Sequence, residues 1–224
     1  MNIEKYNIGK KEVTLYHSEE TGSPLVVLNT FFGDGSSVIE VAKQIEKKDF
    51  NMLCIGSLDW DHDMTPWYCP PLSPNDHPCT GGADGYLKLL VEDILPEALR
   101  RMAGVPSHIS IAGYSLAGLF ALYAMYHTDV FERAACISGS LWFSGFKDYV
   151  LSHDMKRTPK KLYLSLGDKE AETKNQYLRT VRENTECVVE HYKAAGFDVT
   201  WEVNPGNHFR EPALRSAKGI LAII

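Results

Sequence analysis

Residues 109–118 read ISIAGYSLAG, an apolar run typical of a strand that meets a serine and continues into a helix-like segment. A serine between a strand and a helix needs a sharp, strained turn, and the residues two positions on either side of it must be small. Gly113 and Ala117 meet this requirement around Ser115, and Gly118 lets the helix pack close to the sheet. Such a turn raises the serine hydroxyl above the sheet. We therefore expect Ser115 to be a nucleophile.

Short apolar, β-branched runs alternate with helix-length periodic segments along the rest of the chain. Strands are expected at 3–8, 12–17, 25–29, 51–55, 108–113, 133–138, 162–166 and 199–203, and helices near 36–47, 84–103, 116–127 and 170–195. This order predicts an α/β protein with the α/β-hydrolase fold: a mostly parallel eight-stranded sheet, opened by an antiparallel hairpin, with helices on both faces. No linker, repeat or room for a separate cap domain is evident, so residues 1–224 are expected to form a single domain.

The composition narrows the classes of partner. The net charge of −6 argues against binding to a phosphate backbone, which requires a basic surface. No apolar run approaches the ~20 residues that cross a bilayer, and no leader pattern opens the sequence, so we expect a cytoplasmic protein without a membrane partner. Five scattered cysteines are expected to be free thiols in that setting. The oligomeric state is left open.

A nucleophilic serine needs a base and an orienting acid, which in this fold follow later strands in the order acid, then histidine. His208 lies in a Gly/Pro loop after the last expected strand. The segment after strand 162–166 offers Asp168 and Glu170, and either carboxylate could orient the imidazole. Its spacing from Gly167 favours Glu170. The carboxylate that is not used is expected to cap the following helix.

Two backbone amides are expected to stabilise an oxyanion. The first is the N–H of Leu116, which directly follows Ser115 at the start of a helix. The second belongs to the loop after strand 25–29, where the sequence narrows it to Phe31 or Phe32.

The segment 57–82 is rich in proline and aromatic residues and shows little periodicity. A loop of this length in a compact domain is usually functional or disordered, and its aromatic residues favour an ordered loop. It leaves from the end of a parallel strand, where α/β proteins bind their ligands. We therefore expect it to form one wall of the substrate pocket, with Trp60, Asp63 and Trp67 as substrate-binding residues.

Metal and cofactor sites are not expected. The same segment holds residue types that bind metals, namely Asp61, His62, Asp63, Cys69, His77 and Cys79. Their spacing matches no zinc or EF-hand pattern. No Walker or dinucleotide fingerprint occurs elsewhere in the chain.

The run AGYSLAG at 112–118, followed by CISGSLW at 136–142, resembles the putative-esterase family, which includes esterase D, siderophore esterases, feruloyl esterases and mycolyltransferases. The stretches DMTPW at 63–67 and GGADGY at 81–86 are similar to family segments that flank the active site. The resemblance covers most of residues 24–215. It implies esterase or acyl-transfer chemistry with Ser115 as nucleophile and His208 as base, and it places Phe32 where mycolyltransferases have an oxyanion amide.

These patterns favour a serine hydrolase that cleaves small-molecule carboxylic esters through an acyl-enzyme. An acyltransferase that uses the same acyl-enzyme is one alternative. The other is a hydrolase fold that only binds its ligand.

Overall fold

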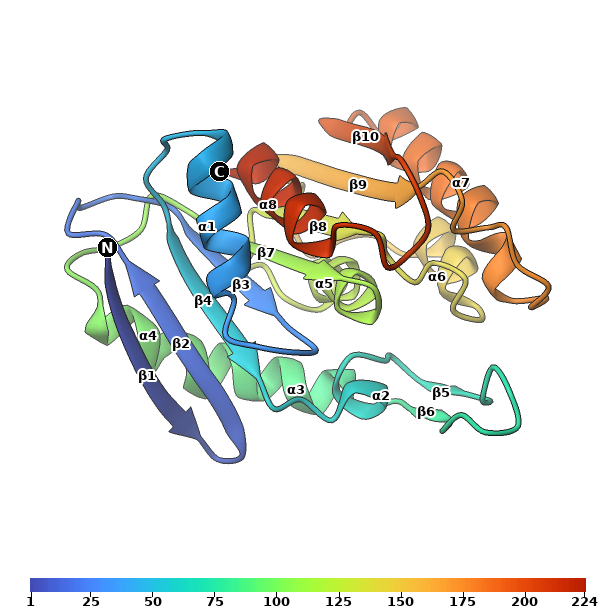
Figure 1. Ribbon diagram of the computed structural model, residues 1–224, viewed down its shortest axis with the longest axis horizontal. Coiled ribbons are helices and arrows are strands. Elements are labelled where there is room, and N and C mark those ends of the chain that lie inside the picture. Colours follow the sequence, from blue (N-terminus) through green and yellow to red (C-terminus); the bar gives the residue numbers. More distant parts are fainter.

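The computed structural model describes residues 1–224 and is built on one eight-stranded sheet (Figure 1). Across the sheet the strands lie in the order β1 (Asn2–Ile8), β2 (Lys11–His17), β4 (Asn51–Gly56), β3 (Leu25–Asn29), β7 (Ile109–Tyr114), β8 (Arg133–Ile137), β9 (Lys161–Gly167) and β10 (Val199–Asn204). β2 is antiparallel to both neighbours, and all other adjacent pairs are parallel. The expected α/β-hydrolase sheet is therefore confirmed.

Helices cover both faces of this sheet. α1 (Ser36–Ile45) and α8 (Pro212–Ile223) lie on one face, and α3 (Ala83–Leu89), α4 (Leu95–Arg101), α5 (Leu116–His127), α6 (Phe146–Ser152) and α7 (Val181–Ala194) pack on the other (Figure 1). Successive strand residues point to opposite faces. In β3, Leu25 and Val27 accordingly join the core under α5, and Val26 and Leu28 join the core under α1 and α8. Every residue of β3 is buried, as expected of a parallel strand covered on both sides.

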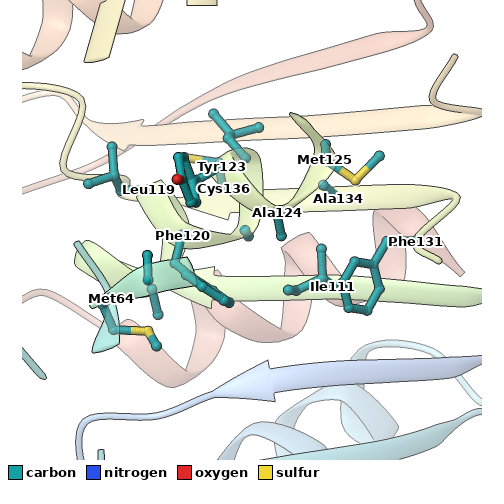
Figure 2. Close-up of a cluster of buried hydrophobic side chains, with 14 of the residues drawn as sticks. Met64, Ile111, Leu119, Phe120, Tyr123, Ala124, Met125, Phe131, Ala134 and Cys136 are labelled. Atoms are coloured by element: carbon teal, nitrogen blue, oxygen red, sulfur yellow. The ribbon is translucent and has the colours of Figure 1, made fainter. Parts of the chain in front are cut away.

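The centre of the larger core is α5, which starts directly after Ser115. All of its residues except His127 are buried, so the helix is apolar around its whole circumference. Figure 2 shows Phe120 and Tyr123 of α5 among Ile111 and Cys136 of the neighbouring strands. This packing holds the helix N-terminus rigidly at the edge of the sheet.

The helix expected near 84–103 is present but irregular. α3 and α4 are joined by a π-helical turn, η1 (Leu90–Ile94), which ends just before Pro96. Proline has no N–H to donate and its ring crowds the preceding turn, which is a known cause of such irregularity.

The helix expected at 170–195 is wrong over its first part. Residues 170–177 form turns, a short 3₁₀ turn η2 (Leu178–Thr180) follows, and α7 begins only at Val181. The side chain of Asn175 accepts hydrogen bonds from the N–H groups of Tyr177 and Leu178, which favours a turn over a helix. The end is confirmed, because Gly196 adopts a left-handed φ of 81° just beyond the helix.

The segment 57–82 is ordered by a short helix, α2 (Trp60–Asp63), and by a two-stranded hairpin of β5 (Tyr68–Cys69) and β6 (Cys79–Thr80). Cys69 and Cys79 lie opposite each other in this hairpin, and all five cysteines are free thiols. The helices of the protein are all too short or too polar to cross a membrane.

Candidate active site

Ser115 occupies a strained turn between β7 and α5. Its φ of 62° and ψ of −125° are unfavourable for a residue with a side chain, and strain of this kind costs on the order of 1–3 kcal/mol. A Cβ on Gly113 would lie 2.2 Å from the backbone of Ala117, so only glycine fits there. A Cβ on Gly118 would meet Gly139 at 3.1 Å. The small residues expected around the turn are therefore required by its close backbone contacts.

A chain of hydrogen bonds joins Ser115, His208 and Glu170. Ser115 Oγ lies 3.0 Å from His208 Nε2, and His208 Nδ1 lies 2.6 Å from Glu170 Oε2. The three residues follow β7, β10 and β9, whose carboxyl ends meet at one edge of the sheet. This geometry places His208 Nε2 where it can accept the proton of the Ser115 hydroxyl.

Glu170 is buried, with 3% of its side chain exposed. Burial disfavours its charged form, but the hydrogen bond and charge of His208 and the N–H of Gly167 outweigh burial, so the pKa of Glu170 is lowered from 4.5. Asp168 instead accepts a hydrogen bond from the N–H of Gly206 at 2.6 Å. Asp168 thus holds the loop before His208, and the expectation that the unused carboxylate caps a helix is wrong.

Arg215 of α8 is a residue of the site that our sequence analysis missed. Its guanidinium is 2% exposed and lies 2.9 Å from Glu170 Oε1. It also donates to the carbonyl oxygens of Pro205 and Asn207, and to Ser138 Oγ. One buried cation therefore joins the carboxylate to the loop that carries His208. Our sequence analysis expected no helix over 212–223, and the only signal in the sequence is an arginine among the apolar residues of that segment.

The backbone of His208 is held from a second side. The Tyr114 hydroxyl donates to the His208 carbonyl oxygen at 2.6 Å, and the two rings lie 5.3 Å apart. Tyr114 directly precedes Ser115, so one turn positions both the serine and the histidine.

The two amides expected to hold an oxyanion are both free of protein partners. Leu116 is the first residue of α5, so its N–H has no acceptor within the helix. In the loop after β3, Thr30 N–H bonds Ile55, whereas the N–H groups of Phe31 and Phe32 bond no protein acceptor. Phe31 and Phe32 line a cavity together with Ser115.

Ser115 lies between two cavities. The loop-side cavity, about 530 Å³, is lined by residues of segment 57–82 and by Ser140 and Trp142. The β3-side cavity, about 580 Å³, is lined by the loop after β3, Tyr114 and the start of α8. Both sizes suit a small organic ligand. Five residues line both cavities: Trp60, Asp61, Ser115, His208 and Phe209.

Of the three residues expected to bind substrate, only Trp60 lines these cavities. The Trp67 indole donates to the Ser144 carbonyl oxygen at 2.8 Å and packs 5.8 Å from the Phe143 ring, which makes it an anchor of the loop. Asp63 is buried against Lys11 and accepts a hydrogen bond from the N–H of Asp59. Asp63 and Trp67 are therefore corrected to structural residues, since their side chains are engaged away from the cavities.

The segment that carries metal-binding residue types does not gather them. No group of three or more His, Cys, Asp or Glu side chains is arranged to hold a metal ion. His62, for example, bonds the Thr80 hydroxyl at 2.7 Å.

Comparison with known proteins identifies the family of the chain. The model of the family described as "Putative esterase" matches residues 28–212, and the chain belongs to this family. A Bacillus subtilis protein described as uncharacterized protein YbbA is 23% identical over 215 residues, which are 88% of this chain and 83% of that protein.

Many solved structures share the fold, including the following two. An IroE-like serine hydrolase from Shewanella oneidensis has a TM-score of 0.77 at 16% identity, over 98% of this chain and 78% of the other. The siderophore hydrolase EstA from Aspergillus nidulans has a TM-score of 0.69 at 17% identity, over 98% and 92%.

The two tryptophans should respond differently to replacement by alanine. Trp67→Ala should lose about 3 kcal/mol of unfolding free energy, as large aromatic deletions do, without changing the ranking of ester substrates. Trp60→Ala should change KM or that ranking more than it changes stability. Denaturant unfolding and a panel of p-nitrophenyl esters measure both effects. An unchanged ranking in Trp60→Ala would contradict the assignment of Trp60 to the substrate cavity.

Replacement of Arg215 should destabilise the protein. Arg215→Met keeps the apolar volume but leaves the Glu170 carboxylate buried without its cation, so we expect a loss of about 3–5 kcal/mol in denaturant unfolding. The matched control is Arg210→Met. The Arg210 side chain is 59% exposed, so its replacement should change the unfolding free energy by less than about 1 kcal/mol. Equal stabilities for the two variants would contradict the role given to Arg215.

Proposed function

We propose that this chain is a serine hydrolase that cleaves carboxylic esters through an acyl-enzyme on Ser115. The observation that carries the proposal is the continuous hydrogen-bond chain from the Ser115 hydroxyl through His208 to the buried Glu170. Membership of an esterase family supports the ester bond as the target.

In the first half-reaction, Ser115 Oγ attacks the ester carbonyl carbon and His208 Nε2 takes the hydroxyl proton. Glu170 stays ionised, fixes the imidazole tautomer through Nδ1 and stabilises the imidazolium. The tetrahedral intermediate then collapses. Its C–O bond to the alcohol breaks, and His208 returns the proton to the leaving oxygen.

In the second half-reaction, water replaces the alcohol. His208 takes a proton from the water, whose oxygen attacks the acyl carbon. Collapse of the second intermediate breaks the bond to Ser115 Oγ, the serine regains its proton, and the carboxylic acid leaves.

We assign the stabilisation of the negative charge on the substrate oxygen to two hydrogen-bond donors, the backbone N–H groups of Leu116 and Phe32. The partner-free Leu116 N–H at the start of α5 supports the first assignment, since a helix N-terminus carries partial positive charge. The partner-free amide of Phe32 beside Ser115 in the β3-side cavity supports the second. Such donors act strongly because they are oriented before the reaction.

We also propose that residues 1–224 form a single domain, since one sheet runs from β1 to β10. The cytoplasmic location and the absence of a nucleic-acid partner stay predictions from composition.

The nucleophile is tested by Ser115→Ala. We expect a loss of about 10⁶-fold in kcat with a nearly unchanged thermal midpoint, because alanine fits the same turn and leaves His208 without a nucleophile. A fluorophosphonate probe should label the wild-type protein on Ser115, as located by peptide mass spectrometry. Activity within tenfold of wild type, or an adduct on Ser140, whose hydroxyl lies 3.3 Å away, would overturn the assignment.

The acid is tested by two isosteric variants. Glu170→Gln should reduce kcat by about 10⁴-fold, since the amide cannot stabilise the imidazolium. Asp168→Asn is the matched control and should keep most of the activity, because Asp168 contacts only the loop backbone. If Glu170→Gln is nearly as active as the control, the enzyme works with Ser115 and His208 alone.

A further inference from the structure

The charged side chains that line the two cavities beside Ser115 are predominantly negative. Neither cavity is lined by a lysine or an arginine. The loop-side cavity is lined by three carboxylates, those of Asp61, Asp76 and Glu170, and the β3-side cavity by Asp61 alone. A cleft lined by charge of one sign concentrates its field on a bound ligand.

These carboxylates differ in how far their charge is compensated. Glu170 is paired with Arg215 and His208. Asp76 lies in an exposed part of the loop, where water screens it.

Asp61 is partly buried, and only its backbone carbonyl accepts a hydrogen bond, from the Thr65 hydroxyl, whereas its carboxylate has no hydrogen-bond or salt-bridge partner. The Asp61 charge therefore has no paired cation, only His77 nearby opposes it, and a substrate in either cavity would meet it.

The position of Asp61 follows from the fold of segment 57–82. Trp60 and Asp61 begin α2, and both line the two cavities, as do Ser115 and His208. An ester whose carbonyl carbon lies at Ser115 would extend its acyl and alcohol parts into the two different cavities. Asp61 borders both parts, wherever each of them lies.

The charged groups that act on Asp61 are mainly negative, while its partial burial by itself disfavours the ionised carboxylate. Burial raises the pKa of Asp61, the charges of Asp59 and Asp76 add to the rise, and His77 opposes it. The remaining surface of the β3-side cavity is mainly apolar, with Phe31, Phe32 and Phe209 exposed around it.

We propose that Asp61 is a specificity-determining residue that excludes esters with a negative charge in either the acyl or the alcohol part, so that the substrate is a neutral or cationic ester with apolar groups. This inference rests on the proposed esterase function. It names the class of ester that the same site accepts.

The test compares esters of matched shape. p-Nitrophenyl hexanoate, p-nitrophenyl monoadipate and p-nitrophenyl ω-trimethylammoniohexanoate carry a neutral, an anionic and a cationic acyl part. The hexanoate of a carboxylated p-nitrophenol carries the negative charge in the alcohol part. Each kcat/KM is divided by the rate of that ester with hydroxide, which removes differences in intrinsic reactivity.

For the wild-type protein we expect both anionic esters to react more slowly than the neutral ester, and the difference to narrow as salt is added. Asp61→Asn should raise the relative kcat/KM of both anionic esters by about threefold to tenfold and lower that of the cationic ester, as expected for one charge a few ångströms away.

Asp59→Asn is the matched control. Asp59 precedes α2, makes no side-chain cap and lines neither cavity, so its replacement changes the net charge equally but should change the ratios by less than twofold. Thermal midpoints check that both variants are folded.

The outcomes separate the two proposals. If the wild-type protein turns over the neutral ester but treats the anionic esters equally, or if Asp61→Asn leaves the ratios unchanged, this inference is wrong and the proposed function stands. If no ester reacts and Ser115 takes no fluorophosphonate, the proposed function is wrong and the inference falls with it.

Discussion

The buried guanidinium of Arg215 is the interaction on which the geometry of this site depends. It binds Glu170 Oε1 and two carbonyl oxygens of the loop before His208, so it holds the acid and the histidine loop in one register. A buried ion pair of this kind costs desolvation energy and is a weak source of stability. Its value here is positional. Without it, the loops after β9 and β10 would still be joined by hydrogen bonds of residues 168–169 to residues 204–206 and by the His208–Glu170 contact, but no buried cation would bind both loops.

The strained turn at Ser115 is maintained by the packing around it. The middle of the β7 strand and all of the apolar α5 helix except His127 are buried, so the turn between them cannot relax without opening the core. The stabilisation gained by burying this many apolar side chains far exceeds the energetic cost of one unfavourable φ. The Ser115 hydroxyl is thereby held at the edge of the sheet, within 3.0 Å of His208.

Segment 57–82 serves two purposes with neighbouring residues. Trp67 and Asp63 attach it to the body of the protein through Ser144 and Lys11, whereas Trp60 and Asp61 border the cavities. Attachment by the first pair keeps the second pair over Ser115. The proposed charge selectivity therefore depends on a rigid loop, since a mobile Asp61 would be screened by water.

The sequence by itself determined the positions of the strands along the chain, the mostly parallel eight-stranded sheet, the turn at Ser115, and the positions of Glu170 and His208 after strand ends. These features follow from local patterns: apolar alternation, small residues at fixed spacing, and Gly/Pro loops. Spacing favoured Glu170 over Asp168, but only the tertiary structure showed that Glu170 contacts His208, separated Trp60 from Trp67, and brought Arg215 beside Glu170. Each of these features depends on where a side chain points and on contacts between segments that are distant in the sequence. Arg215 and Glu170, for example, are 45 residues apart. Such contacts leave no periodicity in the sequence.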